Sequence, residues 1–166
     1  MRKIVAGSEA QEIEMRTVKF RGKSVKSNNE PIWKYGWLDR SDTPAGIAYI
    51  IQTDGWPNSV YPETTGQYTG MKDKSGIEIY EGDVVQIRRR NMDHIRGVVV
   101  YDPTRTCYTL QGVLTQHWAF PEWKPGMDWT FLAGMGDNYQ VLGNIFDDEE
   151  LAEEFGSAYK EDLADE

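Results

Sequence analysis

The sequence predicts a mainly β fold, with a small SH3-like barrel, additional β-hairpins and a short C-terminal helix. Three observations predict it: short runs of β-branched and aromatic residues recur at hairpin spacing, turn-forming residues separate these runs, and helical spacing of apolar residues occurs near the C-terminus. The chain has 166 residues, of which 39% are hydrophobic and 12% aromatic, enough to bury a core as one compact unit.

The N-terminal half predicts three strands. Alternating residues in 15–20 and 33–38 indicate the two strands of a hairpin, joined by the polar run 26–30. The segment 47–52 is rich in β-branched and aromatic residues, so we expect a third strand there that is buried on both faces.

The middle of the chain predicts two loops and then a meander. Turn-forming residues are frequent in 54–58 and 66–76, which predicts ordered loops at both places. A Gly82–Asp83 turn then feeds the first of three successive strands. Such meanders close into small SH3-like barrels, and closure removes exposed strand edges. The three strands are expected within 79–87, at 97–101 and at 107–110.

The C-terminal part predicts a final strand and a helix. Large aromatic residues in 112–135 lie among prolines and glycines, a pattern too broken for a helix, so strand fragments and an aromatic-lined loop are expected. A closing strand is predicted for 139–145. Acidic residues from Asp147 onward favour a helix N-terminus, and Leu151 and Phe155 lie four residues apart, as one apolar stripe requires.

Three segments follow from this pattern: an N-terminal extension (1–14), a β domain (15–146) and an acidic C-terminal helix and tail (147–166). The extension shows no clean hydrophobic period, which at a chain end is typical of a segment outside the packed domain. The tail is acidic through most of its length and is expected to be solvated or regulatory.

Composition limits the kinds of site and partner. With Cys107 as the single cysteine, an intramolecular disulfide is excluded, and no Cys/His cluster has structural-zinc spacing, so no metal or cofactor is expected. The chain shows neither a signal peptide nor a run of 18 apolar residues, which predicts a cytoplasmic protein without a membrane partner. A net charge of −9 and a pI near 4.8 oppose broad adhesion to nucleic acid.

Three segments, 18–23, 62–83 and 142–148, resemble the YopX-like phage proteins. The middle segment is long and gapless, and the flanking segments follow in the order that the family has. The resemblance covers roughly residues 15 to 155. The family-like residues of the middle segment include Gly66, Gln67, Tyr68, Thr69, Gly70, Tyr80, Glu81, Gly82 and Asp83.

The resemblance implies a mostly β fold with a small barrel, and an origin in a bacteriophage or prophage. It therefore implies the cytoplasm of an infected or lysogenic bacterial cell. It implies no activity, because the family provides no catalytic residue to carry over. The aromatic region 112–129 does not align with the family pattern, so a pocket there would be particular to this chain.

Two segments are candidate anion or nucleic-acid sites. The glycines and hydroxyls of 66–70, followed by lysines, can cradle a phosphate, but the segment lacks the Gly-Lys-Ser/Thr ending of a P-loop, and a turn needs glycines for backbone reasons alone. A basic cluster can grip phosphates, or instead be a solvated loop or dock the acidic tail. This cluster consists of Arg88, Arg89, Arg90 and Arg96.

Aromatic residues between 118 and 131 are a candidate interaction surface, since exposed tryptophans are strong anchors, although such residues also fill cores. The candidate anchors are Trp118, Trp123 and Trp129. A catalytic site is not expected, because His94 and His117 are the only histidines and Cys107 lies in a predicted strand.

Two functional hypotheses follow. The first is a non-enzymatic binding or accessory module that forms homo-oligomers and contacts phage or host proteins. The second is a nucleic-acid-associated factor that uses Arg88 to Arg96, and an uncharacterised hydrolase is a third, more distant alternative. Salt separates the first two, since phosphate contacts weaken steeply as salt rises.

Overall fold

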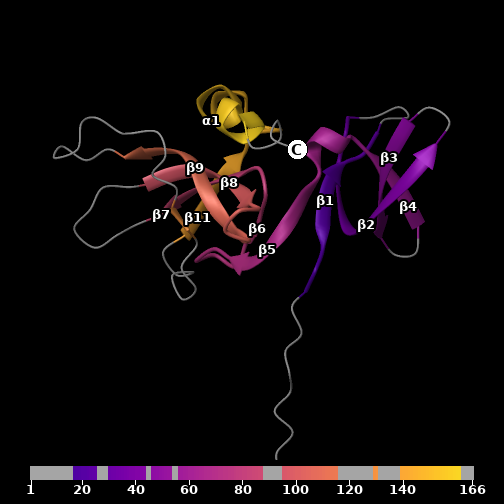
Figure 1. The fold of residues 1–166 in the computed structure, drawn as a ribbon, viewed down its shortest axis with the longest axis horizontal. Coiled ribbons are helices and arrows are strands. Elements are labelled where there is room, and N and C mark those ends of the chain that lie inside the picture. The colour runs from indigo at the N-terminus through magenta and orange to yellow at the C-terminus, as the bar shows by residue number, and fades with distance from the viewer. Residues whose placement is uncertain are drawn as a thin grey trace, which may run out of the picture.

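The computed structural model describes residues 17–25, 30–43, 46–53, 56–87, 95–115, 129–130 and 139–161. They form two antiparallel sheets and a C-terminal helix (Figure 1), which confirms the mainly β class. The first sheet has six strands in the order β4-β3-β2-β1-β5-β6, and the second has five in the order β10-β9-β8-β7-β11. The elements are β1 (Phe20–Lys23), β2 (Trp33–Thr43), β3 (Gly46–Thr53), β4 (Trp56–Val60), the 3-10 helix η1 (Pro62–Thr64), β5 (Gly66–Lys72), β6 (Glu78–Tyr80), β7 (Asp83–Ile87), β8 (Ile95–Asp102), β9 (Cys107–Thr115), β10 (Trp129–Thr130), β11 (Tyr139–Asn144) and α1 (Glu149–Glu161).

Strand β1 lies inside the first sheet, because it pairs with β2 along one edge and with β5 along the other. This confirms the predicted hairpin, but its first strand begins at Phe20, the last residue of the 15–20 segment expected to form it. An isolated bridge between Ser24 and Val60 also joins the end of β1 to the end of β4. A Cβ at Gly22 would lie 2.9 Å from Val60 Cγ2, so glycine permits this close approach.

Two segments that the sequence predicts as loops are largely strand. The region 66–76 begins with β5, and 54–58 overlaps the start of β4. Gly70 has a φ of +86° at the register shift between β5 and β6, so this glycine accommodates an irregularity instead of ending the strand. Pro57 lies in β4, an edge strand with a neighbouring strand on one side only. Proline, which lacks an N–H, is tolerated there because no strand on the other side needs that donor.

Strand β3 confirms the third predicted strand but not its expected burial. Ile51 is fully buried, whereas the next residue, Gln52, is exposed. The described part of β3 therefore has one covered face and one open face, as a strand in an antiparallel sheet often has.

The second sheet confirms the predicted meander of β7, β8 and β9 but not the SH3-like barrel. Its outer strands are β10, which pairs with β9, and β11, which pairs with β7. These two outer strands do not pair with each other, so among the described residues the sheet is open. A small barrel has one enclosed face, whereas this sheet is covered on both faces. The strands in 79–110 fit either arrangement, because both bury apolar residues on short antiparallel strands.

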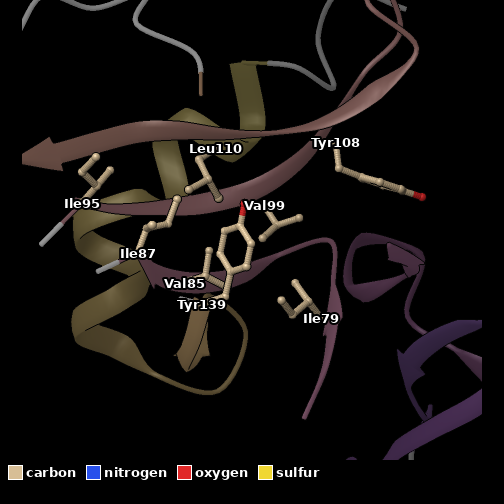
Figure 2. Packing of buried hydrophobic residues seen from close by; sticks show 8 residues of the cluster. All are labelled: Ile79, Val85, Ile87, Ile95, Val99, Tyr108, Leu110 and Tyr139. Atoms are coloured by element: carbon tan, nitrogen blue, oxygen red, sulfur yellow. The ribbon is translucent and has the colours of Figure 1, made fainter. Parts of the chain in front are cut away.

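Each face of the second sheet has its own core. On one face the Tyr139 ring lies among aliphatic side chains from four strands (Figure 2), and on the other face α1 covers the sheet. The first core consists of Ile79, Val85, Ile87, Ile95, Val99, Tyr108, Leu110 and Tyr139. The second consists of Val84, Val98, Val100, Leu151, Phe155 and Tyr159.

The helix α1 confirms the predicted C-terminal helix. Asp148 caps its first turn, because its Oδ1 accepts the N–H of Leu151 at 3.1 Å. Leu151, Phe155 and Tyr159 form one apolar stripe at spacing of four and face the sheet. A Cβ at Gly112 would lie 3.2 Å from the Phe155 ring, so glycine leaves room for this side chain.

Several predicted features lie outside the described residues, namely the extension 1–14, the loop parts of the aromatic region and the end of the acidic tail. Among the helices that the structure describes, none is long and apolar enough to span a membrane.

The turn at Glu81 and Gly82 carries the chain from the first sheet to the second. Gly82 has a φ of +79°, and a Cβ there would lie 2.5 Å from the Phe146 ring. Its N–H donates to the Val99 carbonyl at 2.9 Å, and its carbonyl accepts the N–H of Ile145 at 3.1 Å. The position thus requires glycine for two separate reasons, backbone conformation and space.

We predict that Gly82→Ala lowers the free energy of unfolding by about 2–5 kcal/mol, since the strained backbone and the clash with Phe146 add. Gly76→Ala is the matched control, because Gly76 has a φ of +83° but nothing within 4 Å of its Cβ position. The control should lose only about 1–2 kcal/mol. Urea unfolding of both variants measures the difference, and equal losses would contradict the close packing at Gly82.

Candidate interaction site at the junction of the two sheets

The family-like residues 66–70 form the first part of β5, and two of their backbone N–H groups have acceptors within the protein. Gln67 donates its N–H to Glu81 Oε2 at 2.6 Å, and Tyr68 donates to the Lys19 carbonyl at 2.8 Å. A Cβ at Gly66 would lie 2.7 Å from the Glu81 carbonyl oxygen. These contacts favour the structural interpretation of the glycines over a phosphate cradle, which needs free N–H groups.

The junction of the two sheets is built around a buried ion pair. Arg21 of β1 contacts Asp83, the first residue of β7, with 2.6 Å between Nη2 and Oδ1. The two side chains are 7% and 3% exposed. Arg21 also donates to the Glu81 carbonyl at 3.1 Å, and Asp83 Oδ2 accepts the N–H of Tyr80 at 2.8 Å. The hydrogen bonds give both buried charges additional partners, as such a pair requires.

Aromatic rings enclose the Arg21 guanidinium. Its Cζ lies 4.6 Å from the centre of the Trp33 ring and 4.9 Å from that of Tyr80. These are distances at which a cation and a ring attract each other. Tyr80 in turn contacts Tyr35 and Tyr68, with ring centres 5.7 and 5.5 Å apart. A continuous set of rings therefore extends across β2, β5 and β6.

Two lysines near Arg21 make further ion pairs: Lys19, which directly precedes β1, and Lys23, the last residue of β1. Lys19 Nζ lies 2.5 Å from Glu78 Oε2, within the first sheet. Lys23 Nζ lies 2.5 Å from Asp147 Oδ1, in the turn before α1, and this carboxylate also accepts the N–H of the Trp33 indole at 2.6 Å. Lys19, Arg21 and Lys23 lie on the same side of this extended segment because successive members are two residues apart.

Burial shifts the titration of the junction side chains. Burial raises the pKa of Asp83, although the Arg21 guanidinium acts in the opposite direction. Burial likewise raises the pKa of Glu81, although the hydrogen bond from the Gln67 N–H acts in the opposite direction. The pKa of the Tyr80 hydroxyl is also raised, first by burial and then by its hydrogen bond to Glu78. The tyrosine therefore stays protonated and donates.

Asp73 connects the β5–β6 hairpin to β11. Its Oδ1 accepts the N–H groups of Ser75 at 2.7 Å and Ile77 at 3.0 Å, and its Oδ2 accepts that of Val141 at 3.1 Å. Burial alone would raise the pKa of Asp73, but these three donors outweigh burial and lower it. The carboxylate thus replaces a neighbouring strand at the edge of the second sheet.

The arrangement places paired charges inside the junction and aromatic side chains at its open side. Tyr35 is 46% exposed and Trp37, two residues further along β2, is 66% exposed. The described residues contain no group of three or more His, Cys, Asp or Glu positioned to hold a metal ion. The open side of the junction therefore presents aromatic surface.

The structure describes only some of the predicted site residues. Arg88, Arg89, Arg90, Trp118 and Trp123 lie outside the described residues. Arg96 lies in β8, and its Nη1 is 4.0 Å from Glu154 Oε2 of α1. Trp129 lies in β10 and pairs with Leu110 of β9. Arg96 also pairs with β9, at Leu114.

The sequence interpretation missed Arg21 and did not connect it with Asp83, one of the family-like residues. A signal was present, because Lys19, Arg21 and Lys23 alternate along one strand and Trp33, Tyr35 and Trp37 alternate along the next. In an antiparallel pair, Arg21 lies opposite Tyr35 and Lys23 opposite Trp33. Matching the two alternations would have predicted a face on which cations meet aromatic rings.

We predict that Arg21→Met lowers the free energy of unfolding by about 3–5 kcal/mol, because it leaves Asp83 buried without its cation. Arg105→Met is the control, since Arg105 pairs with Asp102 at 3.0 Å but is 52% exposed. The control should lose at most about 1 kcal/mol. Chemical unfolding measures both losses, and a small loss for Arg21→Met would show that the buried pair is dispensable.

Asp73→Asn should lower the free energy of unfolding by about 1–3 kcal/mol at pH 7, because an amide offers a donor where the carboxylate accepts an N–H. A lowered native pKa contributes stability that is complete above the unfolded value of about 3.9 and is lost as pH falls through the native value. The difference between wild type and variant should therefore shrink below about pH 4. Urea unfolding from pH 7 to pH 3 tests this, and a pH-independent difference would exclude the assigned role of the carboxylate.

Comparison with known families accounts for most of the chain. The family described as YopX protein matches residues 11–153, a range that contains every described strand and the first turn of α1. No curated protein matches the chain. The resemblance drawn from 18–23, 62–83 and 142–148 is thus confirmed, and the chain belongs to the YopX family.

Proposed function

We propose that this protein is a non-enzymatic binding module, an accessory protein of phage or prophage origin that self-associates and contacts other proteins. The observation that carries the proposal is the exposure of two tryptophans in the first sheet, one on an inner strand and one on the edge strand. Trp37 of β2 is 66% exposed and Trp56, the first residue of β4, is 77% exposed. Tryptophan is among the residues that contribute most to protein interfaces when it becomes buried.

The register of the sheet supports two separate surfaces. Trp37 lies opposite Gln52, which lies opposite Pro57, and both of these neighbours are exposed. Trp37 therefore stands on an open sheet face. Trp56 lies opposite Thr53 at the beginning of the edge strand. We assign self-association to the edge at Trp56 and contact with other proteins to the face at Trp37.

The strand edges are partly occupied, which supports self-association through side chains and disfavours self-association by strand pairing between two copies of the chain. The outer edge of β11 is occupied, since Lys74 donates its N–H to the Tyr139 carbonyl at 3.1 Å. The end of β4 is occupied as well, because Val25 donates its N–H to the Ser59 carbonyl at 2.8 Å. Pro57 removes a donor from the remaining part of β4. Such features generally prevent edge-to-edge association.

The paired charges of the junction support a binding role over catalysis. Lys19, Arg21 and Lys23 each contact a carboxylate, and these carboxylates are thereby engaged in ion pairs. A general acid or base has to be available to a substrate. A junction whose ionisable groups stabilise one another is better suited to holding the two sheets in a fixed arrangement.

The alternative function, binding of nucleic acid through the basic cluster, can be tested separately. Arg96, the described member of the basic cluster, lies within 4.0 Å of Glu154, which favours internal use of this arginine. The net charge of −9 weakens long-range attraction to a polyanion. Binding of single- or double-stranded DNA or RNA that falls steeply with salt and is abolished by replacing Arg88, Arg89 and Arg90 with serine would instead favour the nucleic-acid role.

We expect light scattering to give a mass that is a multiple of the 19.0 kDa chain for the wild type. Trp56→Ser should shift the mass toward the monomer, because it removes the most exposed aromatic anchor of the edge. Ile77→Ser is the matched control, since Ile77 is an apolar residue that is 51% exposed in the turn before β6. A monomeric wild type would contradict self-association.

A further inference from the structure

The face of β2 carries three exposed side chains in a row. Tyr35, Trp37 and Asp39 alternate along the strand and therefore share one face. Tyr35 is 46% and Trp37 66% exposed, and Asp39 is exposed as well. Successive members of such a row are about 7 Å apart, so one partner side chain can contact a ring and the carboxylate together.

The uncompensated charge of this face is negative. The neighbouring cations Lys19, just before β1, and Arg21 and Lys23 of β1 are each paired with a carboxylate of another segment. Asp39 forms no ion pair with any residue that the structure describes. A partner that neutralises this face must therefore be cationic, and a phosphate group would be repelled.

The protein itself shows which cation fits such a face. Within the junction, the Arg21 guanidinium lies 4.6 Å from the centre of the Trp33 ring and pairs with Asp83. Trp33 and Trp37 belong to the same face of β2, four residues apart. Trp33 thus lies beside an arginine that pairs with Asp83 of β7, whereas Trp37, two residues from Asp39 on the same face of β2, is exposed.

We infer that the surface formed by Tyr35, Trp37 and Asp39 binds an arginine side chain within a basic polypeptide segment. The planar guanidinium can stack on an aromatic ring while its N–H groups contact a carboxylate, which the compact lysine ammonium does less well. The overall charge of −9 adds long-range attraction for a basic segment. This inference rests on the proposed binding role and defines the chemistry of the partner.

The test is a titration of the full chain with a fluorescent peptide of alternating glycine and arginine, followed by fluorescence anisotropy. A peptide with lysine in place of arginine and one with glutamate are measured beside it. The arginine peptide should bind at least about tenfold more tightly than the lysine peptide, because stacking favours the guanidinium. Equal binding of both cationic peptides would overturn the inference by showing charge attraction alone.

Variants locate the binding on the surface. Trp37→Ser leaves the net charge unchanged and should weaken binding of the arginine peptide by about tenfold or more. Asp39→Asn should weaken this binding by several-fold. Glu63→Gln, at an exposed residue of η1, is the charge control and should bind as the wild type does. Full binding by Trp37→Ser, or tighter binding of a single-stranded oligonucleotide than of the peptide, would overturn the inference.

Oligomeric mass separates this inference from self-association. Trp56→Ser should become monomeric and still bind the arginine peptide, whereas Trp37→Ser should keep the wild-type mass. A Trp37→Ser protein that becomes monomeric would show that a second copy of the chain occupies this face and would overturn the inference. A monomeric wild type that binds the arginine peptide would contradict self-association and leave the arginine site in place.

Discussion

Arg21 and Asp83 meet at the point where the two sheets join, and the arrangement of the molecule depends on this contact. The two side chains are 7% and 3% exposed, and such a pair is stable only while both charges keep their partners. Asp83 begins β7, directly after the Glu81–Gly82 turn that leads from the first sheet. The ion pair therefore fixes where the second sheet starts relative to β1 of the first.

Several family-like residues lie around the same contact. Gly66 allows close approach of the Glu81 backbone, Tyr80 stacks on Arg21, and Gly82 leaves room for Phe146. Each of these residues supports the junction from a different side. Among them, Tyr80 also contacts Tyr35 of β2, the strand on which the exposed aromatic residues lie.

Local pattern predicted much of the fold and little of the junction. Alternation in 33–38 and the apolar runs around Val85 and Val99 specify strands through neighbouring residues alone, and the spacing of Leu151 and Phe155 specifies a helix. The open second sheet was not predictable in this way, because a buried strand looks the same in a barrel and in a sheet covered on both faces. Arg21 and Asp83 are far apart in sequence, and neither carries a local signal of its partner.

If the Arg21–Asp83 pair joins the two sheets, they open as one cooperative unit, and hydrogen exchange of backbone N–H groups tests this most directly. In the wild type, N–H groups in β2 and in β8 should exchange with similar opening free energies. In Asp83→Asn, protection should fall in both strands together, because the variant removes the contact that joins the sheets. Loss of protection in only one sheet would contradict the account, since it would show that the sheets are stable independently of the Arg21–Asp83 pair.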